Sequence, residues 1–173
     1  MAKLGLLHVY TGNGKGKSSA AFGLALRALG QGLRVCVIQF NKDTTYSGEY
    51  RASQDLEGLE LRQFGSGSFV RGEPSEEDVR LTREGLEYAA RAMASGKFDM
   101  VILDELNVAV HLKILTAQEA LEAIRGRLEE VEVVVTGRYA TEELIQEADY
   151  VTEMRMVKHP FDRGVRARRG IEF

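Results

Sequence analysis

A glycine-rich loop with two lysines, residues 11–19, constrains the fold of this chain more than any other segment. It reads Thr-Gly-Asn-Gly-Lys-Gly-Lys-Ser-Ser, follows the apolar run 4–10 and precedes a helical pattern at 17–29. The glycines let the backbone turn tightly and direct N–H groups at an anion, and the N-terminus of the next helix adds its positive dipole end. Lys17 can then reach a phosphate, and Ser18 can ligate Mg²⁺. The loop therefore predicts a nucleoside triphosphate site. It is a variant form, because threonine replaces the first glycine of Gly-x-x-x-x-Gly-Lys-Ser/Thr.

The composition is that of one ordinary globular domain. The chain has 173 residues, of which 44% are hydrophobic and 28% charged, and no apolar stretch approaches the roughly 20 residues of a membrane span. The N-terminal residues lack a signal-peptide pattern, so we expect a cytoplasmic protein without a membrane partner. Cys36 lies inside the apolar run 33–40, which indicates burial in a strand and not catalysis.

The C-terminal residues form a basic strip on a chain whose net charge is −3. Residues 155–173 hold six lysine or arginine residues against two acidic ones. Such a strip can bind nucleic acid, but it has no aromatic stacking pattern beyond Phe161, and the acidic remainder would repel a polyanion. We therefore favour a tail, residues 157–173, that closes over a phosphate-rich ligand. A solvated terminus is the alternative.

Strand-like and helix-like segments alternate along the chain. The strand-like runs, most of them continuously apolar, are 4–10, 33–40, 59–64, 99–104, 131–136 and 150–156, and the helical patterns are 17–29, 75–95, 117–128 and 142–148. Continuous apolar runs favour a parallel sheet covered on both faces. Ser75 is expected to cap one helix, and Thr116 with Glu119 forms a capping box for the next.

This order predicts a three-layer α/β fold of the P-loop NTPase-like (RecA-like) type, with a mainly parallel sheet of about six strands. We expect a single domain over residues 1–173. Two long connections, 41–58 and 65–74, have little regular pattern, and loops of this kind often carry function.

A second nucleotide-site pattern ends the apolar run 98–103, where Asp104 and Glu105 follow. Carboxylates at the carboxyl end of a strand beside a phosphate loop hold Mg²⁺ directly or through water. The alternative interpretation is an acidic helix cap. Arg138, after another such run, can contact phosphate or lie on the surface.

Two other patterns carry no prediction. Asn41-Lys42-Asp43 resembles a guanine-reading sequence, but it lacks the residue required between Lys and Asp, so we treat it as a coincidence and favour adenine. The three histidines, His8, His111 and His159, do not have the spacing of metal ligands.

Five segments together resemble one family: Thr11-Gly-Asn-Gly-Lys-Gly-Lys-Ser-Ser-Ala-Ala-Phe-Gly, Val37-Ile-Gln-Phe, Val101-Ile-Leu-Asp-Glu-Leu, Val135-Thr-Gly-Arg and Lys158-His-Pro-Phe-Asp-Arg-Gly-Val-Arg-Ala. The chain is similar to the P-loop-type ATP:corrinoid adenosyltransferases, which act on cob(I)alamin or cob(I)yrinic acid a,c-diamide. The resemblance runs from residue 4 to the C-terminus.

The resemblance implies transfer of the 5′-deoxyadenosyl group of ATP to Co(I) of a reduced corrinoid, with release of triphosphate, in adenosylcobalamin biosynthesis or salvage. Lys17 would stabilise charge, and a general base is not expected. Mg²⁺, or Mn²⁺ in its place, would be held by Ser18 and Glu105, with Asp104 as the other ligand. The residues expected to bind ATP are Thr11, Gly12, Asn13, Gly14, Lys15, Gly16, Lys17, Ser18, Ser19 and Arg27. The family also implies a reductase that supplies Co(I), and a homodimer.

The loop 65–72 bears on the choice of corrinoid. Family members that convert complete cobalamin carry bulky aromatic residues there, whereas this chain has only Phe69. We expect Phe69 and Arg71 to meet the corrinoid. The choice between cobalamin and its a,c-diamide precursor stays open.

Two other functions are compatible with a phosphate loop. One is an ATP-dependent nucleic-acid-binding P-loop protein, which the basic tail suggests, although we do not expect nucleic acid as a partner. The other is a small-molecule kinase, which would leave ADP in place of triphosphate.

Overall fold

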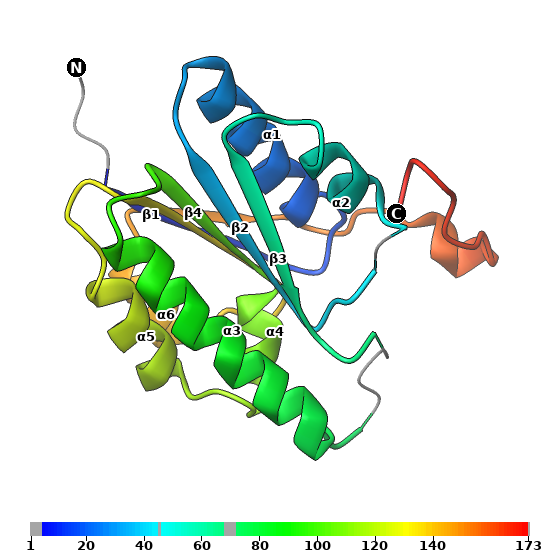
Figure 1. Cartoon of the computed structure of the whole chain (residues 1–173). Coiled ribbons are helices and arrows are strands. Elements are labelled where there is room, and N and C mark those ends of the chain that lie inside the picture. Colours follow the sequence, from blue (N-terminus) through cyan, green and yellow to red (C-terminus); the bar gives the residue numbers. More distant parts are fainter. Residues whose placement is uncertain (1–4, 45, 68–71, 173) are drawn as a thin grey trace.

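A six-stranded, wholly parallel sheet forms the centre of the molecule (Figure 1). The computed structural model describes residues 5–44, 46–67 and 72–172. The strands are β1 (Leu7–Thr11), β2 (Val35–Phe40), β3 (Leu59–Phe64), β4 (Met100–Asp104), β5 (Glu132–Thr136) and β6 (Tyr150–Glu153), in the spatial order β3-β2-β4-β5-β1-β6. This confirms the predicted α/β class and all six predicted strands. β6 ends three residues early, because Met154 turns toward the phosphate loop and accepts a 2.6 Å hydrogen bond from the Gly14 amide.

Helices cover both faces of the sheet and complete the three layers. One face carries α1 (Lys17–Gly30) and α2 (Gly48–Ser53), and the other carries α3 (Glu76–Ala94), α4 (Leu106–His111), α5 (Ala117–Arg125) and α6 (Glu142–Glu147), while a short 3₁₀ helix, η1, spans Pro160–Arg163 (Figure 1). The predicted caps are confirmed: Ser75 and Thr116 each form a capping box, with Asp78 and Glu119 respectively. No helix within the described ranges is long and apolar enough to cross a membrane.

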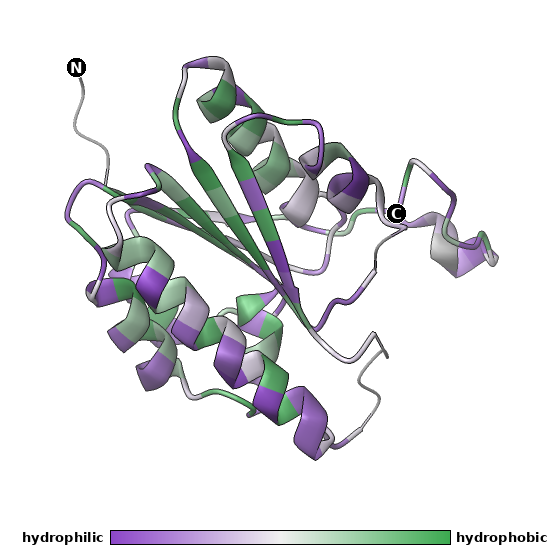
Figure 2. Ribbon diagram, in the orientation of Figure 1, coloured by the Kyte–Doolittle hydropathy of each residue, from purple (hydrophilic) through white to green (hydrophobic). Residues whose placement is uncertain are grey.

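The core consists of two apolar clusters, one on each face of the sheet. Successive residues of β2 alternate between them: Cys36 packs toward α3 and Val37 toward α1. Small buried residues of α1, Ala21 and Ala25 among them, let that helix lie close to the strands. Because both faces are covered, β2 is buried along its whole length and is apolar except for Gln39, whereas the edge strand β3 alternates in hydropathy (Figure 2).

The parallel arrangement brings the ends of the strands together. The phosphate loop follows β1, while the segments after β2, β4 and β5 leave from the same carboxyl edge. In open α/β sheets this edge is where ligands bind. The segment 41–58, which we predicted to be largely irregular, contains the short helix α2, capped by Ser47, whose side chain accepts a hydrogen bond from the Tyr50 amide.

Candidate functional site

The phosphate loop joins β1 directly to α1. Gly16 precedes the helix with φ at 116°, a left-handed conformation that glycine adopts without strain. Lys17, the first residue of α1, is buried, and its ammonium donates hydrogen bonds to the carbonyls of Gly12 (2.7 Å) and Gly14 (2.8 Å). Burial lowers the pKa of Lys17, and the nearby charge of Arg138 adds to the shift. The lysine is therefore held within the loop from which it would reach a phosphate.

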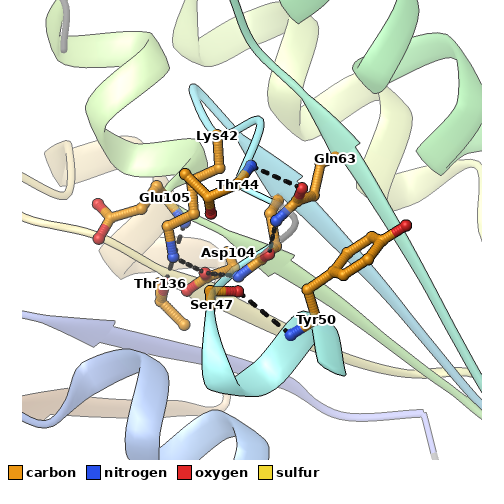
Figure 3. Close-up of polar contacts among 9 residues, drawn as sticks. Lys42, Thr44, Ser47, Tyr50, Gln63, Asp104, Glu105 and Thr136 are labelled. Atoms are coloured by element: carbon orange, nitrogen blue, oxygen red, sulfur yellow. Dashed lines mark hydrogen bonds and ion pairs between the residues drawn. The ribbon is translucent and has the colours of Figure 1, made fainter. Parts of the chain in front are cut away.

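Asp104 is the centre of a buried polar cluster at the end of β4 (Figure 3). Its Oδ1 accepts a hydrogen bond from the Thr136 hydroxyl (2.7 Å). Its Oδ2 accepts from Gln39 Nε2 (2.9 Å) and from the Lys42 ammonium (2.7 Å). Burial opposes ionisation, but the charge and hydrogen bond of Lys42, with hydrogen bonds from Ser18 and Thr136, hold the pKa of Asp104 below its ordinary value. The carboxylate is therefore ionised although it is fully buried.

Glu105, the next residue, has a different environment. Its backbone lies in the left-handed region with φ at 66°, and its amide donates to the Thr136 hydroxyl oxygen (3.0 Å). This turn directs the side chain away from the cluster around Asp104 (Figure 3). Burial, followed by repulsion from Asp104, raises the pKa of Glu105.

A chain of side-chain amides extends the cluster across the sheet edge (Figure 3). Gln39 Oε1 accepts from Gln63 Nε2 (2.9 Å), and Gln63 Oε1 accepts from the Thr44 amide (2.9 Å). The register places Gln39 opposite both Gln63 and Asp104. The start of the 41–58 connection is thus tied to Asp104 by hydrogen bonds.

These elements surround a cavity of about 690 Å³. Its charged lining from the sheet edge and the phosphate loop comprises Lys15, Lys17, Lys42, Glu105 and Arg138. Apolar residues of α1, of the segment around α2 and of the start of β3 form another wall, namely Phe22, Leu26, Ala52, Leu56 and Leu59. The tail contributes His159, Gly170, Ile171 and Glu172. The cavity combines cations suited to phosphates with an apolar surface suited to a flat ring.

The tail lies against the phosphate loop. The Lys15 ammonium donates to the Ile171 carbonyl and to Glu172 Oε1, both at 3.1 Å, and Glu172 also accepts from Arg168. The sequence predicted a tail that closes over a phosphate-rich ligand. Its position beside the loop agrees with that prediction, and the ligand itself stays a prediction.

Some of the predicted site residues line the cavity and others do not. Lys17, Ser18, Glu105 and Arg138 line one cavity, and Asp104 lies directly behind it. Arg27 is exposed on α1 and is not among the residues that line this cavity. Phe69 and Arg71 lie outside the described residues.

One residue of the site was missed by the sequence analysis. We treated Asn41-Lys42-Asp43 as a coincidence, yet Lys42 forms an ion pair with Asp104 across adjacent strands. The signal that could have identified Lys42 is its position soon after a buried parallel strand. Polar residues at that point face the ligand-binding edge.

Comparison with known proteins gives a consistent result. Residues 3–173 match the family described as ATP:corrinoid adenosyltransferase BtuR/CobO/CobP. A corrinoid adenosyltransferase of Escherichia coli (strain K12) is 40% identical over 169 residues, which cover 98% of this chain and 86% of that protein. The corrinoid adenosyltransferase CobA of Salmonella typhimurium (strain LT2) is 38% identical over 169 residues, with the same shares of the two chains.

A solved structure supports the fold. The crystal structure of the RadB recombinase superposes with a TM-score of 0.53 at 13% identity, over 91% of this chain and 78% of that one. This likeness agrees with the predicted RecA-like arrangement. The match over nearly the whole chain, the phosphate loop and the identity to curated relatives lead to one assignment: the chain belongs to the ATP:corrinoid adenosyltransferase family.

Proposed function

We propose that this enzyme transfers the 5′-deoxyadenosyl group of ATP to the Co(I) centre of a corrinoid and releases inorganic triphosphate. The observation that carries the proposal is the family match over residues 3–173, within which the Gly16-Lys17-Ser18 end of the phosphate loop is intact. In this reaction cobalt supplies the electron pair for the new Co–C5′ bond, and the C5′–O bond breaks toward the triphosphate. The protein positions the reactants and neutralises charge, and no general base is needed.

Negative charge develops on the departing triphosphate, and the cations of the cavity are suited to stabilise it. Lys17 and the amides of the phosphate loop would act from the β1 side, and Arg138 from the end of β5. Such preorganised groups are effective because they need no rearrangement as the charge develops.

We propose that Mg²⁺, or Mn²⁺ in its place, is held with the triphosphate by Ser18 and Asp104. Ser18 lines the cavity, Asp104 lies directly behind it, and oxygen atoms are the ligands that Mg²⁺ prefers. Mg²⁺ would neutralise phosphate charge. Among the described residues, no group of three or more His, Cys, Asp or Glu side chains could hold a metal ion, but a site completed by phosphate and water does not need one. Glu105, which the sequence favoured, lines the cavity and is the second candidate ligand.

We propose that loop 65–72 forms the corrinoid side of the site, with Phe69 against the macrocycle and Arg71 at its polar rim. The described start of the loop supports this proposal, because Gly65 packs directly on the backbone of Asn41 and Lys42, at the edge of the cavity. We further propose a homodimer, a reductase that supplies Co(I), and no nucleic-acid partner.

Product analysis tests the proposed reaction. ATP, Mg²⁺ and a chemically reduced corrinoid should give an adenosylated corrinoid, followed by its absorbance change, and one equivalent of triphosphate, identified by anion-exchange chromatography. ADP as the phosphate product would indicate a kinase instead. Salt-dependent binding of DNA or RNA without corrinoid adenosylation would favour the nucleic-acid-binding alternative.

A further inference from the structure

We propose that Lys42 is a second triphosphate-binding lysine, which acts from the β2 side of the cavity while Lys17 acts from the β1 side. The inference rests on the proposed function, because it assigns Lys42 to the triphosphate of that reaction. It adds a residue of the 41–58 connection to the site. No phosphate-loop pattern includes this position.

The ion pair with Asp104 determines where the Lys42 ammonium lies. Nζ is 2.7 Å from Asp104 Oδ2 (Figure 3), and Ser18 of the phosphate loop lines the same cavity as Lys42. Residues of two distant segments therefore line one cavity. An anion that contacts Ser18 is within the neighbourhood of Lys42 as well.

Exposure leaves Lys42 able to bind a further ligand. The Lys42 side chain is 30% exposed and lines the cavity, whereas the Asp104 side chain is 0% exposed. An ammonium has three N–H donors, and one of them is directed at Asp104 Oδ2. The cavity side of the ammonium is the side from which a phosphate oxygen would approach.

The backbone holds Lys42 in this place before any ligand arrives. The Asn41 amide donates to the Phe64 carbonyl (2.8 Å), and Asn41 has a left-handed φ of 56°. Gly65 packs so closely against this segment that a Cβ on it would lie 2.4 Å from the backbone nitrogen of Lys42. A lysine that is already ordered loses less conformational entropy on binding an anion.

The competing explanation is that Lys42 only neutralises Asp104. A double-mutant cycle separates the two explanations, with binding of tripolyphosphate measured by calorimetry in the presence of EDTA. In the Asp104→Asn background there is no carboxylate to neutralise. Adding Lys42→Met to Asp104→Asn should still weaken tripolyphosphate binding by about 10- to 100-fold, the usual effect of losing a hydrogen bond to a charged group.

The double variant should fold, because neither partner of the ion pair is left with an unpaired charge. Lys97→Met is the matched control, because Lys97 is exposed and precedes β4, at the opposite end of that strand from Asp104. Its substitution should change the tripolyphosphate affinity less than twofold. Lys42→Arg keeps the charge and should retain most of the affinity.

An affinity of the double variant within twofold of that of Asp104→Asn would overturn the proposal. This measurement needs neither corrinoid nor turnover. A failure of the Lys42 assignment is therefore distinguishable from a failure of adenosyl transfer, which the product analysis tests separately.

Discussion

Asp104 and Glu105 are neighbours in sequence, but their surroundings suit different roles. Asp104 is fully buried, yet its ion pair with Lys42 holds its pKa low, whereas the pKa of Glu105 is raised by burial and its side chain turns away. Asp104→Asn should therefore raise the Mg²⁺ concentration needed for half-maximal rate by about tenfold or more, and more than Glu105→Gln does. Initial rates over a Mg²⁺ titration measure this, with circular dichroism as the control for folding. A larger shift for Glu105→Gln would make Glu105 the principal ligand.

Among the elements, α5 depends on its capping box for its first turn. Hydrogen bonds from the backbone and side chain of Thr116, and from Arg83, lower the pKa of Glu119 to about 2, compared with 4.5 ordinarily. A depressed pKa stabilises the fold above pH 4.5, and this stabilisation is lost as the pH falls toward 2. Glu119→Gln should lower the free energy of unfolding by about 1 kcal/mol at pH 7, and by much less near pH 2. Urea unfolding at both pH values checks this. Glu122→Gln, on the same helix but outside the capping box, is the matched control.

At the scale of the whole molecule, the C-terminal tail meets the phosphate loop at the cavity. Glu172 of the tail pairs with Lys15 of the phosphate loop and adds a negative charge where phosphates are proposed to bind. Glu172→Gln should therefore tighten ATP binding by about two- to fivefold at low salt, as expected for an exposed ion pair, and the difference should shrink as salt screens the charge. Calorimetry at two ionic strengths measures it, with the exposed Glu57→Gln as control. Weaker ATP binding would mean that the contact mainly orders the loop.

Elements whose signals are local were predictable from the residues alone. Continuous apolar runs predicted most of the six strands, because parallel strands covered on both faces carry no polar alternation. The phosphate loop and the Ser75 and Thr116 caps were predictable because turn and cap geometry depends on a few adjacent residues. The short helix α2 was missed, since its six residues are too few for a helical period to emerge.

Only the tertiary structure decided which side chains share the site. The order of the strands places Gln39 of β2 beside Asp104 of β4, and so brings Lys42 to a carboxylate 62 positions away along the chain. Arg27, by contrast, lies ten residues into α1. At 1.5 Å per residue this places it about 15 Å along the helix axis from the phosphate loop. Contacts between distant segments depend on strand order, register and loop path. No local pattern encodes these, because each depends on the whole sheet being assembled.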